Sequence, residues 1–252
     1  MAGNFELRTK YQFAGLVERR DRLNGFRDDA GAQNRFAQLI GHTWARENCA
    51  LDEVGKTSSW LQGTLDEKRV LQLNHHVGAA QWFLNCSRSQ ASLSCANLLE
   101  LHHRLMEGIH PLASRFRESE ISSFGEGHEP IEAELVPYVV ENALEWFSSD
   151  SFHEMHEVEK TALILMKLVD IWPFEEGNGL TLRLFANFFL LKSGYPPAII
   201  PSTKAPQYAA AIQNSFRFHT QPLIDLLTEA VLQGLLYCLA EPTGAPRLDI
   251  VG

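Results

Sequence analysis

Apolar residues recur at helical spacing along almost the whole chain, and this pattern limits the possible folds more than any other feature. Within 31–48, for example, Phe36, Leu39, Ile40 and Trp44 are spaced to share one side of a helix. Glycine and proline interrupt the pattern, most clearly at Gly194-Tyr-Pro-Pro, where a helix is expected to end. The sequence therefore predicts an all-α fold. Helices are expected at about residues 10–24, 31–48, 64–85, 91–107, 130–147, 153–171, 179–193, 205–216 and 222–239.

Two local patterns refine this prediction. Thr64 followed by Glu67 is typical of a capping box at a helix start. The stretch Ile121-Ser-Ser-Phe-Gly-Glu-Gly-His looks extended and predicts a short hairpin or flap. We expect an N-terminal helical region over 1–60, a core domain over 61–240 and a flexible tail over 241–252.

Composition limits the partners and the compartment. The net charge of −9 argues against a nucleic-acid partner, which would need basic faces. The four cysteines form no CxxC pair or metal-binding spacing, so we expect reduced thiols in the cytoplasm. The N-terminus lacks a secretory apolar segment and no uninterrupted apolar run could span a bilayer, so no membrane partner is expected. His153 and His156 are three apart rather than the four of a zinc helix, and no zinc is expected.

The stretch from Trp172 to Arg183 reads Trp-Pro-Phe-Glu-Glu-Gly-Asn-Gly-Leu-Thr-Leu-Arg. Gly177 and Gly179 allow a tight turn and a close approach to a ligand, and Asn178 tolerates left-handed geometry. Amides of such a turn, at a helix N-terminus, form an anion site that Arg183 could reach. Glu176 is a candidate Mg²⁺ ligand. The alternative is a loop that uses its glycines only to turn.

This stretch resembles the motif of the Fic family, His-Pro-Phe-x-(Asp/Glu)-Gly-Asn-Gly-Arg-x-x-Arg, at seven positions. They are Pro173, Phe174, Glu176, Gly177, Asn178, Gly179 and Arg183. Leu101–Arg117 is similar to the family's approach to its flap, Gly194 to the turn after the motif helix, and Tyr208 to a tyrosine that lies against adenine. The resemblance covers about residues 40–235 and implies a helical Fic fold with a β-hairpin flap and packed N-terminal helices. It also implies ATP or another nucleotide, with Mg²⁺, and transfer of AMP to a protein target.

The chain departs from the motif at two positions that carry chemistry. Trp172 stands where the family has the histidine that takes a proton from the target hydroxyl, and an indole cannot accept one. Leu180 replaces the first motif arginine. Trp172 either fills the vacated site or offers a stacking surface. His128, on the predicted flap, is the histidine that could replace the base.

A second family element is suggested upstream of the core. His42-Thr-Trp-Ala-Arg-Glu47-Asn48 resembles (Ser/Thr)-x-x-x-Glu-(Gly/Asn), which in some members forms an inhibitory helix. The resemblance implies that Glu47 pairs with Arg183 and blocks productive ATP binding. Thr43 and Glu47 are four apart and would share one helix face. A rival match is Ser58 to Gly63, with Gln62 in place of the glutamate, and the plain alternative is a surface glutamate.

Three functional hypotheses follow. The leading one is a member of the protein AMP-transferase lineage that binds a nucleotide but has impaired or no adenylyl transfer. The second is an active nucleotide-dependent transferase with altered chemistry. The third is a non-catalytic interaction protein with a vestigial pocket. The sequence leaves the target protein and a homodimer open.

Overall fold

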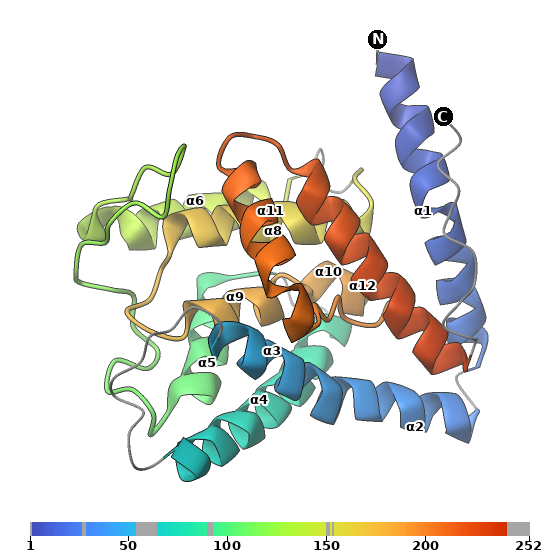
Figure 1. Cartoon of the computed structure of the whole chain (residues 1–252), viewed down its shortest axis with the longest axis horizontal. Coiled ribbons are helices and arrows are strands. Elements are labelled where there is room, and N and C mark those ends of the chain that lie inside the picture. Colours follow the sequence, from blue (N-terminus) through green and yellow to red (C-terminus); the bar gives the residue numbers. More distant parts are fainter. Residues whose placement is uncertain are drawn as a thin grey trace.

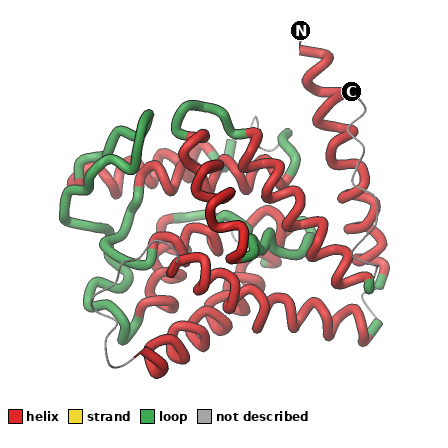
Figure 2. Tube along the Cα trace, in the orientation of Figure 1, coloured by secondary structure: helices red, strands yellow, loops and turns green. Residues whose placement is uncertain are grey.

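The computed structural model describes residues 2–26, 29–53, 65–89, 93–149, 152 and 154–240. Within this part of the chain the regular elements are all helical, which confirms the predicted all-α class (Figure 2). The predicted cap at Thr64, the rival match at Gln62, His153 and the tail 241–252 lie outside the described residues.

The helices follow one another along the chain, with a long irregular connection between residues 106 and 133 (Figure 1). They are α1 (Ala2–Gly25), α2 (Ala30–Gln38), the π-helical turn η1 (Leu39–Thr43), α3 (Trp44–Glu53), α4 (Leu65–Arg88), α5 (Cys95–Met106), the 3₁₀ turn η3 (Ala133–Leu135), α6 (Val136–Trp146), α8 (Glu157–Ile171), α9 (Asn178–Phe185), α10 (Phe188–Lys192), the 3₁₀ turn η4 (Ser202–Lys204), α11 (Ala205–Ser215) and α12 (Gln221–Leu239).

The centre of the fold is formed by α8 and α9, which follow each other around the motif loop. Helix α9 packs against α3, α5 and α8, and α8 also contacts α6, α10 and α12. Seven of the eight α9 residues are buried, including the polar Asn178, Thr181 and Arg183. The predicted helix over 179–193 is broken because the Asn187 side chain donates to Arg183 O and accepts from Ala198 N. The break sets α10 apart from α9.

The N-terminal helices pack onto this core. Helices α1 and α2 lie against α12, and α3 lies against α4 and α9 (Figure 1). The Phe13 ring stacks on His156 with centroids 4.0 Å apart, and the Arg20 guanidinium lies 5.0 Å from the Tyr195 ring centre. Helix α12 has the length and apolar composition of a membrane span, but its apolar residues are largely buried against neighbouring helices, as in the core of a globular domain.

The segment 116–128 forms no strand in this structure, so the hairpin geometry expected for the flap is not observed. Gly125 and Gly127 have positive φ angles of 147° and 85°, which turn the chain away from a regular ladder. Side chains also take up backbone groups that a ladder would use. Ser123 Oγ donates to His128 O at 2.9 Å, and Phe124 N donates to His128 Nδ1 at 3.0 Å. The segment is an irregular loop held by side-chain hydrogen bonds.

Candidate functional site

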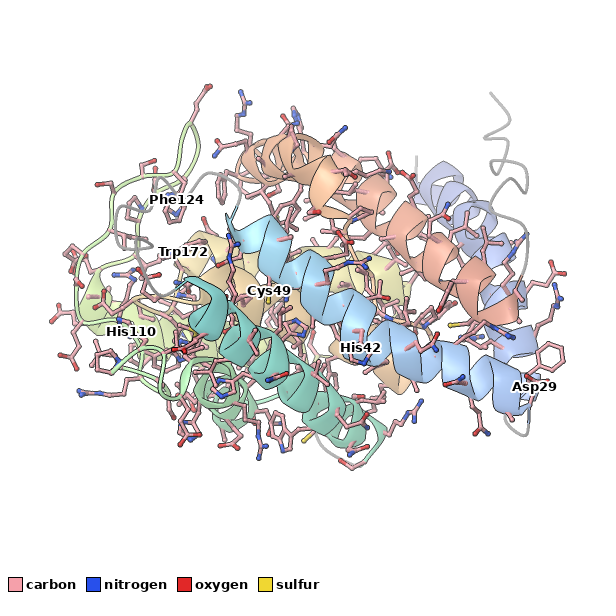
Figure 3. All side chains as sticks on the ribbon, turned by 60° about the horizontal axis from the view of Figure 1, so that its bottom comes forward. Asp29, His42, Cys49, His110, Phe124 and Trp172 are labelled. Carbon is pink, nitrogen blue, oxygen red and sulfur yellow. The ribbon has the colours of Figure 1, made fainter. Side chains whose placement is uncertain are left out.

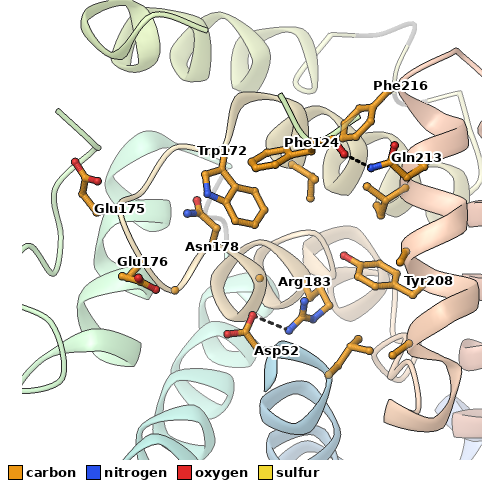
Figure 4. A pocket seen from close by; sticks show the side chains of 17 residues that line it. Asp52, Phe124, Trp172, Glu175, Glu176, Asn178, Arg183, Tyr208, Gln213 and Phe216 are labelled. Carbon is orange, nitrogen blue, oxygen red and sulfur yellow. Dashed lines mark hydrogen bonds and ion pairs between the residues drawn. The ribbon is translucent and has the colours of Figure 1, made fainter. Parts of the chain in front are cut away.

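A cavity of about 450 Å³ opens beside the motif loop (Figure 4). This volume is within the range of small-molecule sites. Residues from α3, the 116–128 segment, the end of α8, the motif loop, α9 and α11 converge on it. The lining residues are Leu51, Asp52, Phe124, Val169, Trp172, Glu175, Glu176, Gly177, Asn178, Gly179, Arg183, Ala205, Tyr208, Ala209, Ile212, Gln213 and Phe216.

The motif loop has two left-handed residues, one at each end. Trp172 ends α8 at φ 50° and ψ 67°, and Gly177 precedes α9 at φ 74° and ψ 9°. Asn178, which would tolerate left-handed geometry, does not adopt it and is the first residue of α9. Its buried side chain accepts from Phe174 N at 2.9 Å and donates to Phe174 O at 2.6 Å. Asn178 therefore closes the loop, while Gly177 supplies the turn.

Neighbouring segments hold the loop from outside. His102 Nδ1 accepts from Ser114 N, and its Nε2 lies 3.0 Å from Glu176 O, where it can donate. The same ring stacks on Phe174 at 3.7 Å, and burial lowers the His102 pKa to about 4. Arg117 Nε donates to Trp172 O at 2.9 Å. These contacts fix the backbone that leads into α9.

Arg183 is buried in the wall of the cavity, and its guanidinium binds residues of α3. Its Nε donates to Asn48 Oδ1 at 2.5 Å, and its Nη2 donates to Asn48 O at 3.0 Å. Nη2 also lies 3.4 Å from Asp52 Oδ1, and the two side chains are only 9% and 11% exposed. The carboxylate that pairs with Arg183 is therefore Asp52.

The predicted pair between Glu47 and Arg183 is wrong in this structure. Glu47 Oε2 accepts from the amide and the hydroxyl of Ser202, at 2.9 and 3.0 Å, and Oε1 accepts from Arg46. Burial raises the pKa of Glu47, but these hydrogen bonds outweigh it and leave the pKa below its usual value. Asn48 and Asp52 are one helical turn apart and face α9 together, whereas Glu47 faces η4. Thr43 is the last residue of η1, half-buried one turn before Glu47.

The Asp52 carboxylate lies close to Gly179, the second residue of α9, and beside Arg183 (Figure 4). A Cβ on Gly179 would collide with Asp52 Oδ1 and would lie 2.8 Å from Arg183 Nη1. Since helix N-termini and arginine both attract anions, the Asp52 carboxylate lies where a negative charge is favoured. A ligand phosphate would have to displace it.

Aromatic side chains form the opposite wall of the cavity. The rings of Phe124 and Trp172 meet edge to face, with centroids 4.7 Å apart (Figures 3 and 4). Tyr208 lies beside Arg183, whose guanidinium carbon is 5.8 Å from the ring centre. Burial raises the pKa of Tyr208, although the charge of Arg183 opposes this. The predicted residues Trp172, Arg183 and Tyr208 therefore come together in one site.

The acids of the loop point in different directions. Glu175 accepts from the amides of Glu118 and Ser119, both at 3.0 Å, and from the Ser119 hydroxyl. The Ser119 hydroxyl contributes most to a lowered Glu175 pKa. Glu176 is exposed at the cavity rim and remains a candidate Mg²⁺ ligand.

His128 does not face the cavity as a base. Its Nδ1 accepts from Phe124 N, and its Nε2 lies 3.0 Å from Asp170 O, an acceptor. His156 belongs to the histidine pair whose spacing does not fit a zinc helix. In the structure it caps α8, and its Nδ1 accepts from Val158 N. The site residues that the sequence reasoning missed are Asp52, Phe124, Gln213, Phe216, His76 and His102.

The fold and the site together define a helical domain with a cavity at the N-terminus of a buried helix. The family model described as Fic/DOC family matches residues 92–190. This chain belongs to that family.

Curated relatives and a solved structure agree with this assignment. The protein adenylyltransferase Fic of Drosophila grimshawi is 28% identical over 252 residues, which are 94% of this chain and 52% of that protein. The protein adenylyltransferase fic-1 of Caenorhabditis elegans is 32% identical over 180 residues, which are 68% of this chain and 35% of that protein. The chain thus spans about half, or less, of the length of these relatives.

The structure of a Fic-1 fragment from C. elegans superimposes on this chain with a TM-score of 0.74 at 22% identity. The match covers 91% of this chain and 70% of that chain. It shows that the fold is the Fic fold. The relatives are protein adenylyltransferases by name.

Proposed function

We propose that this protein binds a nucleoside triphosphate, ATP by preference, and transfers AMP poorly or not at all. The observation that supports binding is the anion site at Gly179, where the N-terminus of α9 and the Arg183 guanidinium meet beside an open cavity. The Asp52 carboxylate already lies at this position, 3.4 Å from Arg183 Nη2. A position that holds one carboxylate can hold a phosphate oxygen of the same charge.

The other walls of the cavity fit the remaining parts of a nucleotide. Tyr208 and Phe216 from the α11 region, with Phe124 opposite, offer aromatic surface for a base. Glu176 at the rim is a single carboxylate, and Mg²⁺ is commonly held by one or two carboxylates together with substrate phosphates. The donor set therefore fits Mg²⁺ carried in with the phosphates. When bound, the ion would neutralise phosphate charge.

The proposal of weak transfer rests on the missing proton acceptor. A target hydroxyl must lose its proton as it attacks the α-phosphate, and Trp172 has only an N–H donor. No histidine lines the cavity among the described residues, and His128 is bonded through both ring nitrogens. Leu180, at the first motif arginine position, is fully buried and contributes to the core. Loss of a general base alone typically costs about 10²–10⁴-fold in rate.

Two measurements test the two halves of the proposal. Equilibrium dialysis with ATP and Mg²⁺ should show saturable binding that Gly179→Ala removes, because the added Cβ enters the space of Asp52 and Arg183. Gly179 has no positive φ, so this change leaves the turn intact. Absence of binding in the unaltered protein would favour a non-catalytic interaction protein with a vestigial pocket.

Incubation with α-labelled ATP and a lysate, or with the protein alone, tests the second half. We expect no labelled AMP on any protein. Robust labelling would support the rival hypothesis of a transferase with altered chemistry. The lineage of the relatives is the basis for proposing a protein target and a homodimer. The four cysteines, none of which forms a disulfide, are the basis for proposing a cytoplasmic location.

A further inference from the structure

We propose that Asn48 and His76 are positioning residues that hold Arg183 against the anion site, so that α3 and α4 form part of the binding site. The inference rests on the proposed nucleotide function in one respect, namely that Arg183 is the cation of that site. The arrangement joins three residues that are far apart in the sequence.

Asn48 is the centre of the arrangement and is only 3% exposed. Its Oδ1 and its main-chain oxygen accept from Arg183 Nε and Nη2, at 2.5 and 3.0 Å. Its Nδ2 donates to Leu180 O at 3.1 Å and lies 2.8 Å from His76 Nε2. One asparagine therefore binds both the side chain of Arg183 and the backbone of the helix that carries it.

The chemistry of the donors fixes the direction of each hydrogen bond. A guanidinium can only donate, so the Asn48 atom that meets Arg183 Nε must be the oxygen. The amide NH₂ then faces Leu180 O and His76 Nε2, and His76 Nε2 must accept. His76 can accept there only as a neutral ring protonated at Nδ1.

The surroundings of His76 keep its ring neutral and closely packed. Its side chain is fully buried, and burial, followed by the charge of Arg183, lowers its pKa to about 3. The Trp44 ring meets it edge on, with centroids 5.8 Å apart and planes at 71°. A protonated His76 would repel Arg183 and would have no lone pair for Asn48.

The consequence for the site is a guanidinium in one orientation. Because Nε and Nη2 are bound to Asn48, the remaining nitrogen, Nη1, lies on the side of Gly179. A Cβ on Gly179 would lie 2.8 Å from Nη1. An arginine fixed in this way loses little side-chain entropy when an anion binds.

The test compares His76→Leu with His76→Gln in the full chain. Glutamine can present an oxygen to the Asn48 amide, whereas leucine cannot. Hydrogen exchange of the Arg183 Nε–H, followed by NMR, reads the arrangement without any ligand. For His76→Leu we expect exchange about tenfold faster and ATP–Mg²⁺ binding about tenfold weaker, the equivalent of one lost hydrogen bond, with much smaller changes for His76→Gln.

His156→Leu is the matched control, because it removes another largely buried histidine whose partners are Phe13, Tyr195 and Val158 and not Asn48 or Arg183. It should lower stability and leave Arg183 exchange unchanged. Equal exchange in His76→Leu and the unaltered protein would overturn the proposal. If exchange responds as expected but the unaltered protein binds no ATP, the proposed function is wrong and the positioning role stands.

A measurement on the unaltered protein covers the case in which His76→Leu does not fold. Nitrogen NMR should show His76 as the neutral Nδ1–H tautomer at pH 7. Protonation at Nε2 instead would mean that the Asn48 amide does not donate to His76, and the proposal would fail.

Discussion

Asp52→Asn is the substitution whose effect on ligand binding follows most directly from the structure. The Asp52 carboxylate lies 3.4 Å from Arg183 Nη2 and covers Gly179, so it competes with any incoming phosphate. Asparagine keeps the shape and an acceptor oxygen but removes the charge. Arg183 keeps its two hydrogen bonds to Asn48.

The size of the effect can be bounded from the distance. Two unit charges 3.4 Å apart interact by about 5 kcal/mol at an effective dielectric constant near 20 and by about 1 kcal/mol in bulk water. Even the lower part of this range corresponds to about tenfold in affinity. We therefore expect Asp52→Asn to bind ATP–Mg²⁺ at least about tenfold more tightly than the unaltered protein.

The same change should weaken the unliganded protein. A hydrogen bond to a charged group contributes about 1.5–3 kcal/mol, and for a chain of this size each kcal/mol shifts Tm by about 2–4 °C. Calorimetric titration with ATP–Mg²⁺ and thermal unfolding without ligand provide the two readouts. Glu47→Gln is the control, because its carboxylate binds Ser202 and not Arg183. Unchanged or weaker ATP binding in Asp52→Asn, or tighter binding in Glu47→Gln, would refute the reasoning.

Three further outcomes are expected. Trp172→His alone should give no detectable AMP labelling, because an imidazole is restored without a second phosphate arginine; strong labelling would show that the base was the sole defect. Leu180→Arg should destabilise the protein, since position 180 is fully buried, and an unchanged Tm would contradict that packing. Acid should unfold the chain early, because burial lowers the pKa of His76 to about 3 and of His102 and His156 to about 4. Above pH 6.5 these histidines are neutral in both the folded and the unfolded chain, and stability is complete. As the pH falls toward 4, only the unfolded chain takes up their protons, and the free energy of unfolding falls. At pH 5 each of these histidines should have lowered the free energy of unfolding by about 2 kcal/mol, so the urea midpoint should fall sharply between pH 7 and pH 5.

The overall architecture could be predicted from the sequence because helical spacing is a local property. The helices at 153–171 and 222–239 were expected from periodicity and are observed as α8 and α12. The break at Asn187 could not be predicted, because it depends on a hydrogen bond to Ala198, which is brought near only by the fold. The irregular 116–128 segment likewise depends on the distant partner of His128, Asp170.

The site was predicted in part for the same reason. Gly177, Gly179, Arg183 and Tyr208 belong to patterns that can be read along the chain, and all line the cavity. The partner of Arg183 was assigned to Glu47 from a short motif. In the structure Arg183 instead binds Asn48 and Asp52, because the rotation of α3 about its axis decides which side chains face α9. Asp52 is an acid one helical turn after Asn48, and this spacing was the signal in the sequence that could have predicted its place beside Arg183.

A crystal structure of the protein soaked with ATP and Mg²⁺ tests the central claim most directly, since the claim concerns one position in space. We predict phosphate density above Gly179, in contact with Arg183 Nη1, with the Asp52 carboxylate moved aside and the base beside Tyr208. Asp52 still covering Gly179 at saturating ATP, with the cavity empty or the phosphates bound elsewhere, would contradict it.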